Sequence, residues 1–545
     1  MKFNKLNNNL FMLSYLLFLF DLTFFCFKFY YEGVVSTELN AISLSSKSFI
    51  LGYLIVPVIS KRSNCTFLNG NSIFFPLILL FPYFLSQVSI FPSIPTSDIL
   101  SVTTDVELLM KGIPLTDVGY GGYPAHLILN CILGLVTDMD LFEIYPIYFG
   151  LISFLIVICI FFISQYFSNT NLGSILYLAT GSLFSYYYLV PATIGLLFFA
   201  MIGFCFFKLL TNQNEVNWKI LLLILIPAII TVHLFSSVFA FFFILSVLII
   251  SKIFPLYKLA VRLVAIFLVF ILAHHIYISY FIFSDAVSNL YNFLSGQELV
   301  AAYNIPAYLG LPNSEMLLII KKISSLFRWI IALLAIWISF NYKKLTKKEQ
   351  EFVIPLICII TCIGFGGILF RYLAPSYGLR LSQYLWIYLC LLASISAQHF
   401  KIIHGNYTFI FYFFVIIITF FGFIDHVNSP QTQVSIQEMA CMEKVTQFSM
   451  NESIVVPVDE KASFYNSNPT GRSNLISIDN FSSSLSWEHA YTDFNGANYV
   501  FLPHDEKLDY YKIRFNVEIP WIKIKSFLSH QILFYNNGKS KVYLL

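Results

Sequence analysis

Residues 220–250 read ILLLILIPAIITVHLFSSVFAFFFILSVLII, an apolar stretch without a single Asp, Glu, Lys or Arg. A membrane-spanning helix needs about 20 mostly apolar residues, because the hydrocarbon core of a bilayer is about 30 Å thick. The stretch is longer than one such helix, and we predict two short helices that extend slightly beyond it, at 218–234 and 236–251. His233 lies between them and interrupts the apolar run.

The apolar character extends along the whole chain. Of its 545 residues, 58% are hydrophobic and 11% are charged, whereas a soluble protein carries about 25% charged residues. Such a chain cannot hide its apolar surface from water, so we expect membrane lipids to be its main surroundings. The net charge of +3 is too small to indicate a nucleic-acid partner.

Further spanning helices follow from the same length criterion. We predict an all-α polytopic membrane domain over residues 1–424, with about 13–14 helices in all. The first span of the chain, 11–28, is expected to be an uncleaved helix, because no clear small-residue cleavage site follows it. The other candidate spans are 46–60, 72–91, 124–138, 144–167, 172–188, 191–207, 259–283, 323–340, 352–371, 379–397 and 406–424.

The positions of Lys and Arg predict the orientation, because cytoplasmic loops are enriched in both. Lys343, Lys344, Lys347 and Lys348 mark the loop 341–351 as inside, and Lys2 and Lys5 mark the N-terminus in the same way. The loop 252–258 is another inside candidate. The loops 92–123 and 284–322 and the tail from Asp425 are then outside.

One inconsistency follows from this orientation. An even number of crossings must join the two outer loops, whereas the candidate spans between them are odd in number. We therefore expect one segment to be re-entrant or interfacial, and the short candidates 124–138 and 172–188 are the two alternatives.

The tail has a different composition from the membrane part. Asn, Ser, Asp and Glu become more frequent, and turn residues separate short strand-like runs. The pair Asn537-Gly538 predicts a hairpin at the end of the chain. We predict that residues 425–545 form a small extracytoplasmic α/β domain. The clearest strand-like runs are 453–458, 498–502, 532–535 and 541–545.

The outer loop 92–123 holds the first candidates for chemistry. Asp98 lies just past the third predicted span, at the bilayer surface, where partial desolvation raises the basicity of a carboxylate. It then suits a general base or a metal ligand beside a leaving phosphate. The alternative is that Asp98 caps the following helix. Asp105 and Glu107 lie two residues apart and so on different helix faces, and solvated charge is their alternative interpretation.

Cationic candidates occur later in the chain. Arg371 and Arg380 lie at the outer ends of adjacent predicted spans, and Arg can hold a phosphate through two parallel hydrogen bonds. Interfacial snorkelling is the alternative for both. His233 is predicted at an outer hairpin tip, where the alternative is a hydrogen-bonded packing histidine. The pair His274-His275 is either a relay or simply buried.

Three features together resemble a known family. They are Asp98 after an early span, the segment Lys111-Gly112-Ile113-Pro114, and Tyr123-Pro124-Ala125-His126 opening the next span. This layout resembles the first outer loop of the GT-C membrane glycosyltransferases. It is closest to archaeal-type multi-pass members that are distantly related to the oligosaccharyltransferase catalytic subunit.

The resemblance implies a function and assigns roles. A sugar or glycan would pass from a polyprenyl-phosphate carrier to a glycan, lipid or protein acceptor at the outer face of the cell membrane. Asp98 would carry catalysis, with Asp105 as the second choice, and a divalent cation such as Mg or Mn is a possible cofactor. The phosphate would be bound by Arg371, Arg380 and His233. Glu107 and Glu315 are candidates for acceptor or metal contacts.

The sequence also departs from this family. The Trp-Trp-Asp motif that oligosaccharyltransferases use for the acceptor sequon is absent, so a simpler sugar transferase is favoured. The main rival is a polysaccharide or glycolipid transporter or polymerase without Asp-based transferase chemistry. A transporter is expected to show internal repeats and broken helices, and no clear repeat is present. A third possibility is a membrane-anchored interaction protein whose tail binds partners.

Overall fold

The structure is a computed structural model that describes the central helices of the chain and several strands. The residues described are 93–94, 97–115, 118, 121–138, 141–168, 171–180, 191–211, 216–251, 257–278, 291, 315–373, 375–399, 415, 418–419, 434–435, 453–456, 474–477, 499–502, 532–536 and 541–544. The predicted spans 11–28, 46–60 and 72–91 and most of 406–424 lie outside these residues.

Apart from α5 and η4, which lie in predicted loops, the described helices overlap the remaining predicted spans. The described helices are α5 Ser97–Met110, α6 Pro124–Thr137, α7 Leu141–Ser168, α8 Leu172–Ala179, α9 Pro191–Thr211, α10 Val216–Val232, α11 Leu234–Ile250, α12 Tyr257–Tyr277, α14 Glu315–Phe340, η4 Tyr342–Lys344, α15 Lys347–Leu373 and α16 Pro375–His399. One boundary differs clearly, because α14 begins eight residues before the predicted start at 323. Part of the predicted outer loop 284–322 is therefore helical.

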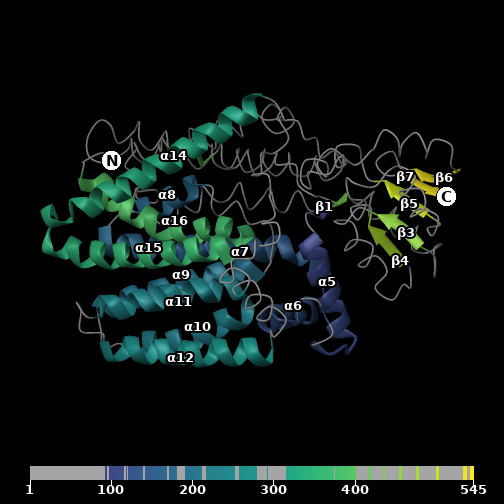
Figure 1. The fold of residues 1–545 in the computed structure, drawn as a ribbon, viewed down its shortest axis with the longest axis horizontal. Helices are drawn as coiled ribbons and strands as arrows, with labels where there is room; N and C mark the ends of the chain where they lie inside the picture. Colours follow the sequence, from purple (N-terminus) through teal and green to yellow (C-terminus); the bar gives the residue numbers. More distant parts are fainter. Residues whose placement is uncertain are drawn as a thin grey trace, which may run out of the picture.

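The long helices lie side by side in a bundle (Figure 1). α10 and α11 are joined only by His233, and α15 and α16 only by residue 374. Such short connections make each pair antiparallel neighbours. Both connections lie at the same end of the bundle, where α12 ends, α14 begins, and α5 and α6 gather (Figure 1). We call this end the 233/374 end.

Basic residues gather at the opposite end of the bundle. Lys208 and Lys219 flank the connection between α9 and α10, and Arg262 lies in the first turns of α12. Lys343 and Lys344 lie in the connection between α14 and α15. Because successive long helices alternate in direction, all of these connections are far from the 233/374 end (Figure 1).

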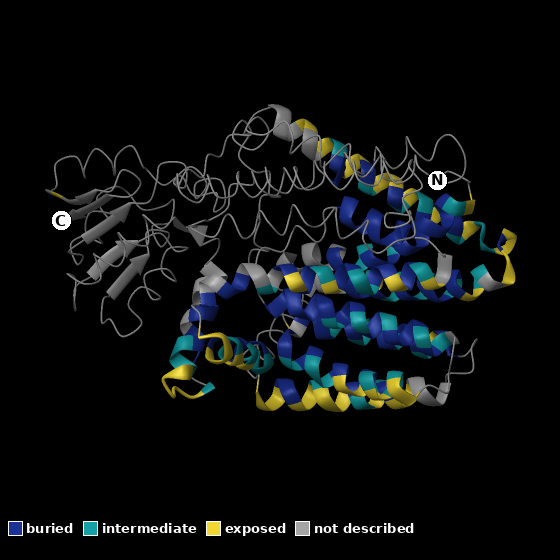
Figure 2. Ribbon diagram, turned by 180° about the vertical axis from the view of Figure 1, so that it is seen from behind, coloured by how far each residue is buried: buried dark blue, intermediate teal, exposed yellow. Residues whose placement is uncertain are grey.

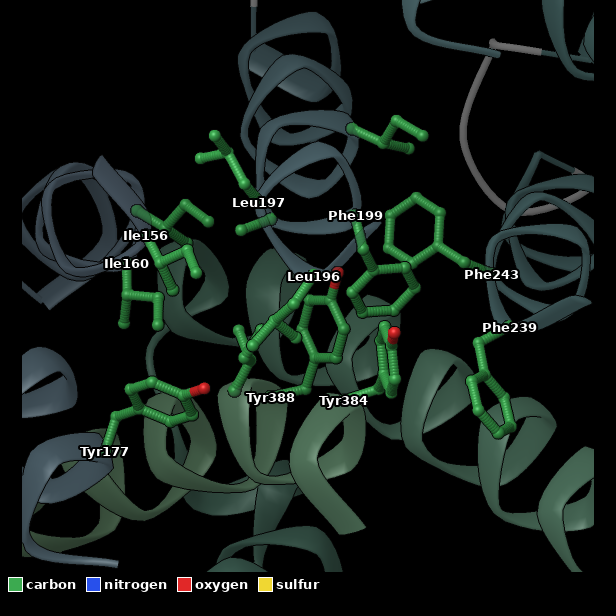
Figure 3. Packing of buried hydrophobic residues seen from close by; sticks show 14 of the residues in the cluster. Ile156, Ile160, Tyr177, Leu196, Leu197, Phe199, Phe239, Phe243, Tyr384 and Tyr388 are labelled. Atoms are coloured by element: carbon green, nitrogen blue, oxygen red, sulfur yellow. The ribbon is translucent and has the colours of Figure 1, made fainter. Parts of the chain in front are cut away.

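An aromatic cluster joins α9, α11 and α16 in the interior (Figure 3). The ring of Phe199 lies edge-on to Tyr384 at 5.0 Å and to Tyr388 at 5.7 Å. Phe239 lies 4.9 Å from Tyr384, and Phe243 stacks on Tyr388 at 5.7 Å. Edge-to-face and offset-stacked rings attract one another beyond simple burial, so these contacts fix the spacing of the three helices.

Glycines allow the closest helix approaches within this cluster. A Cβ atom on Gly195 would lie 2.0 Å from Oγ and 2.6 Å from Cβ of Ser236. A Cβ on Gly203 would lie 2.6 Å from the Tyr388 hydroxyl. Small residues at helix crossings are typical of helices that pack within a bilayer. α9 can therefore contact α11 and α16 only because these positions carry no side chain.

The outward faces of the bundle are apolar. Exposed large hydrophobic residues follow α12 and α14, including Trp329 at 67% exposure (Figure 2). By length and composition, three of the described helices are suited to cross a membrane: Pro191–Leu210, Lys322–Phe340 and Glu349–Ile368. Soluble proteins rarely expose such large apolar surfaces. The helices and their outer faces are thus compatible with a membrane protein.

The described strands form two sheets. β3 Ser453–Val456, β4 Asn474–Ser477, β5 Tyr499–Leu502, β6 Ile532–Asn536 and β7 Lys541–Leu544 form one sheet in the order β4-β3-β5-β7-β6. β3 is parallel to β4 and β5, and β7 is antiparallel to β5 and β6. β3, β5 and β7 lie within the strand-like runs of the sequence, and β6 extends one residue beyond its run. The residues between these strands are not described, so a separate extracytoplasmic α/β domain stays a prediction.

The second sheet joins distant parts of the chain. β1 Ser93–Ile94 pairs antiparallel with β2 Val434–Ser435, and Ser93 lies opposite Ser435. β1 begins four residues before the first residue of α5. The pairing therefore attaches the start of the loop 92–123 to the chain that follows the last predicted span.

The close approach of Gly195 to Ser236 predicts that a side chain at position 195 destabilises the protein. Gly195→Ala would drive a Cβ into the side chain of Ser236, and we expect it to lower the free energy of unfolding by about 1–3 kcal/mol. The measurement is the apparent Tm of the purified protein in one detergent. Gly364→Ala is the matched control, because a Cβ there meets nothing within 4 Å. A wild-type Tm for Gly195→Ala would contradict the described packing.

Candidate functional site

The first part of the candidate site is the helix α5. Asp105 is only 7% exposed, and its neighbours Val102, Thr103 and Val106 are also buried. The interpretation of Asp105 as a solvated charge is therefore wrong, because its side chain is buried away from water. Glu107 on the same helix is half-buried.

Asp98 is the second residue of α5. Because the helix starts at Ser97, Asp98 lies inside the first turn and does not occupy the N-cap position. An acid there still interacts favourably with the helix dipole. Position 98 precedes Asp105 by two helical turns, so both positions lie on one face, about 10.5 Å apart along the axis. The side chain of Asp98 lies outside the described part of the structure.

A tight turn connects α5 to the bundle. A Cβ on Gly121 would lie 2.0 Å from the carbonyl oxygen of Leu115, so this turn requires glycine. The next carbonyl oxygen, of Gly122, accepts a hydrogen bond from Nε2 of His274 at 3.2 Å. The ring of Tyr123 lies 5.6 Å from the ring of His233. The turn thus contacts both α12 and the connection between α10 and α11.

His233 forms that connection by itself. Its backbone is extended, and Nδ1 accepts the backbone N–H of Ser236 at 3.3 Å, which caps α11. Nδ1 also lies 2.8 Å from Oγ of Ser236, and this oxygen lies 2.5 Å from the hydroxyl of Tyr384 on α16. His233 is therefore the hydrogen-bonded packing histidine that the sequence left open. A contact to phosphate stays a prediction.

The two predicted arginines flank the other short connection. Arg371 lies in the last turn of α15, and Arg380 lies in the second turn of α16. α15 and α16 pack against each other, so both positions belong to the 233/374 end (Figure 1). Tyr384 follows Arg380 by one helical turn. The side chains of both arginines, and that of Glu315 at the start of α14, lie outside the described part.

The candidate residues thus form two groups. α5, with Asp98, Asp105 and Glu107, packs against α6, whereas the two short connections of the bundle carry His233 and the arginine positions. The turn at Gly122 and Tyr123 links the groups, because it precedes α6 and contacts His233. Among the side chains that the structure describes, no three His, Cys, Asp or Glu residues are grouped to hold a metal ion.

Other histidines near the turn are buried. Asn130 on α6 donates Nδ2 to the ring of His126 at 3.2 Å and to its backbone oxygen at 2.9 Å. His274 and His275 are both 5% exposed, with ring centroids 5.2 Å apart. Within the described residues, neither ring nitrogen of His275 has a hydrogen-bond partner. The structure therefore favours burial over a relay for this pair.

Arg328 is a charged residue that the sequence reasoning missed. It is half-buried on α14, and Nε donates to the carbonyl oxygen of Thr180 at 2.6 Å. Thr180 is the C-cap of α8, a helix whose residues are all buried. A cation at the C-terminus of a helix satisfies its last carbonyls and its dipole. An arginine inside the predicted span 323–340 was the signal that could have found it.

Neither a scan against protein-family models nor a search of curated proteins finds a match for this chain.

The cap at Thr180 predicts that Arg328 matters for stability. Arg328→Met removes a charged hydrogen bond and leaves a buried carbonyl without this donor, so we expect a loss of about 1.5–3 kcal/mol. Lys322→Met is the matched control, because Lys322 is exposed on the same helix. Unfolding in a single detergent measures both. Equal stability of the two variants would show that the Arg328 contact contributes nothing.

Proposed function

We propose that this protein is a multi-pass glycosyltransferase of the cell membrane, with a GT-C-like helical domain. It moves a sugar or glycan from a polyprenyl-phosphate carrier to an acceptor at the outer face. Residues 425–545 form an extracytoplasmic α/β domain that helps to receive the acceptor. The proposal starts from the observed apolar helices, whose outer surface is compatible with lipid, and adds a specific activity to them.

One observation carries the proposal: the elements that hold the candidate acids and cations gather at one end of the bundle. α5, the His233 connection and the α15–α16 connection all lie at the 233/374 end (Figure 1). A transferase of this kind needs a base near the acceptor and cations near the leaving phosphate. Sugar transfer from a phosphate carrier therefore requires that the elements carrying the base and the cations lie close together.

The distribution of basic residues supports the orientation. Cytoplasmic loops are enriched in Lys and Arg. The connections at the opposite end of the bundle are flanked by or contain Lys208, Lys219, Lys343 and Lys344, whereas Lys111 lies in the connection between α5 and α6. The 233/374 end then faces outward, as does the start of α14. A carrier whose phosphate lies at the outer headgroup level would reach this end from the bilayer.

The length of α6 supports an even number of crossings. With 14 residues, α6 is about 21 Å long, which is shorter than the hydrocarbon core of about 30 Å. It packs against α5, α7 and α10 at the 233/374 end. Lys208 in the last turn of α9 lies 4.5 Å from the ring of Tyr166 near the end of α7, so both helices end on the same side and the segment between them, which contains 172–188, must cross back. We infer that 124–138 is the segment that does not cross.

The proposed chemistry assigns a role to each group. The acceptor hydroxyl attacks the anomeric carbon of the donor sugar and gives its proton to the carboxylate of Asp98 or, as the second choice, Asp105. The bond from that carbon to the phosphate oxygen breaks, and the carrier leaves as a phosphate anion. Arg371, Arg380 and His233 stabilise this charge. Glu107 and Glu315 remain candidates for contacts to the acceptor or to a divalent cation.

A transporter or polymerase is the second candidate. α8 ends inside the bundle, where Arg328 caps it, and buried charges at the ends of short helices are features of transporters. A transporter would move the lipid-linked glycan without needing a carboxylate at position 98. The variant that follows therefore separates the two functions.

Asp98→Asn removes the proposed base and changes little in size. We expect transfer to fall by at least about 10²-fold, because general-base catalysis contributes about that factor. Mass spectrometry of surface glycans measures the loss in a deletion strain complemented with each variant, and a membrane fraction verifies insertion. Asp138→Asn is the control, because Asp138 is exposed at the left-handed C-cap of α6, which Asn tolerates. Unchanged glycans with Asp98→Asn would favour the transporter.

Arg371→Gln and Arg380→Gln test the phosphate contacts. We expect each to weaken binding of a polyprenyl monophosphate about tenfold, which corresponds to about 1.4 kcal/mol. Binding is measured with the protein in lipid nanodiscs at fixed salt. Arg262→Gln is the matched control, because Arg262 is exposed on α12 at the opposite end. Equal affinities for the three variants would remove both arginines from the site.

A further inference from the structure

Helix α14 has two opposite faces. On one side, Ile331, Ala335 and Ile338 are at most 1% exposed, and α14 packs against α16. On the other side, large apolar side chains recur every three or four residues, which places them on a single helix face. All of them are at least 49% exposed: Trp329, Leu333, Ile336 and Phe340 (Figure 2). We call these four residues the exposed row.

The exposed row ends at a basic connection. Residues 341–351 join α14 to α15 through η4 and contain four lysines and two glutamates. Lys343, Lys344 and Lys347 are exposed, and the side chain of Lys348 lies outside the described part. An excess of positive charge therefore follows directly after Phe340, which is 84% exposed.

The connection is held by contacts that leave its lysines out. Oε2 of Glu349 accepts the backbone N–H of Thr346 at 2.9 Å and the hydroxyl of Thr346 at 2.7 Å. Nε2 of Gln350 donates to the carbonyl oxygen of Leu345 at 3.0 Å, and Leu345 is buried. Within the described residues, no ion pair involves the ammonium groups of the three exposed lysines. Their positive charges are therefore available to a partner.

The exposed row has the length of one lipid leaflet. Trp329 and Phe340 lie about 16 Å apart along the axis of α14, and half of the hydrocarbon core of a bilayer is about 15 Å thick. An acyl chain that lies along the exposed row therefore brings its headgroup to the level of the lysines. Juxtamembrane lysines attract anionic headgroups more strongly than neutral ones.

We propose that the exposed row and the lysines of the following connection form a binding surface for an acidic phospholipid. The acyl chains contact the exposed row, and Lys343 and Lys344 contact the phosphate, to which lysine binds as a point charge. This basic end lies opposite the 233/374 end, so the orientation proposed above assigns the lipid to the cytoplasmic leaflet (Figure 1). The surface is separate from the proposed transfer site.

Native mass spectrometry of the full chain in a neutral detergent tests the inference. The spectra measure bound lipid at each concentration of added phosphatidylglycerol or phosphatidylcholine. We expect the wild type to bind phosphatidylglycerol more tightly. The double variant Lys343→Gln/Lys344→Gln should bind phosphatidylglycerol about thirtyfold more weakly, at about fivefold for each lysine, and phosphatidylcholine as before.

Three further variants separate charge from apolar contact. Lys111→Gln/Lys322→Gln is the matched control, because it removes two exposed lysines near the 233/374 end and should leave phosphatidylglycerol binding unchanged. Lys343→Arg/Lys344→Arg keeps both charges and should retain the binding. Phe340→Ala should weaken the binding of both lipids alike, because it removes contact with the acyl chains only.

Several outcomes would overturn the inference. One is equal affinity of the wild type for the two lipids, and another is unchanged phosphatidylglycerol binding by Lys343→Gln/Lys344→Gln. Equal competition by water-soluble glycerol phosphate would assign the lysines to free phosphate instead of a lipid. A dimer that binds no phosphatidylglycerol would assign the exposed row to a second copy of this chain.

Discussion

The hydroxyl of Tyr384 and Oγ of Ser236 lie 2.5 Å apart, and this hydrogen bond joins α16 to the start of α11. It can form only because Gly195 on α9 leaves room for the side chain of Ser236. The aromatic rings around Tyr384 then hold α9, α11 and α16 at one spacing (Figure 3). The position of His233, and of the turn that contacts it, depends on this bond.

Two series of contacts connect the hydrogen bond between Ser236 and Tyr384 to the rest of the candidate site. One leads through Tyr123 and Gly122 to α6 and α5, whose buried face contains Asp105. The other leads along α16 to the connection with α15. Hydrogen bonds and ring contacts connect these elements in the described part of the chain. Directional contacts of this kind suit an interior where water is scarce, because each polar group needs a defined partner.

The sequence predicted the helices well because the signal is local. A run such as 220–250 has the composition of a spanning helix without reference to any other part of the chain. The strand-like runs that correspond to β5, β6 and β7 were found in the same way, from β-branched and aromatic residues between turns. The start of α14 was missed because the prediction began the span after Lys321 and Lys322, and a helix can continue through charged residues.

The site was less predictable because it depends on contacts between distant residues. Nothing near Asp105 in the sequence indicates that its side chain is buried, since the burial comes from the packing of α5. The partnership of Ser236 with Tyr384 joins residues 148 positions apart. Arg328 could have been found, because an arginine within an apolar span needs a partner, but only the structure identifies Thr180 as that partner.

The pairing of β1 with β2 has a consequence for biogenesis. Ser93 and Ile94 are synthesised long before Val434 and Ser435 leave the ribosome. Until then the chain before α5 has no partner for these two residues. The loop that carries Asp98 therefore reaches its final backbone arrangement only when β2 has been synthesised. A chain released before that residue range would lack the pairing of β1 with β2.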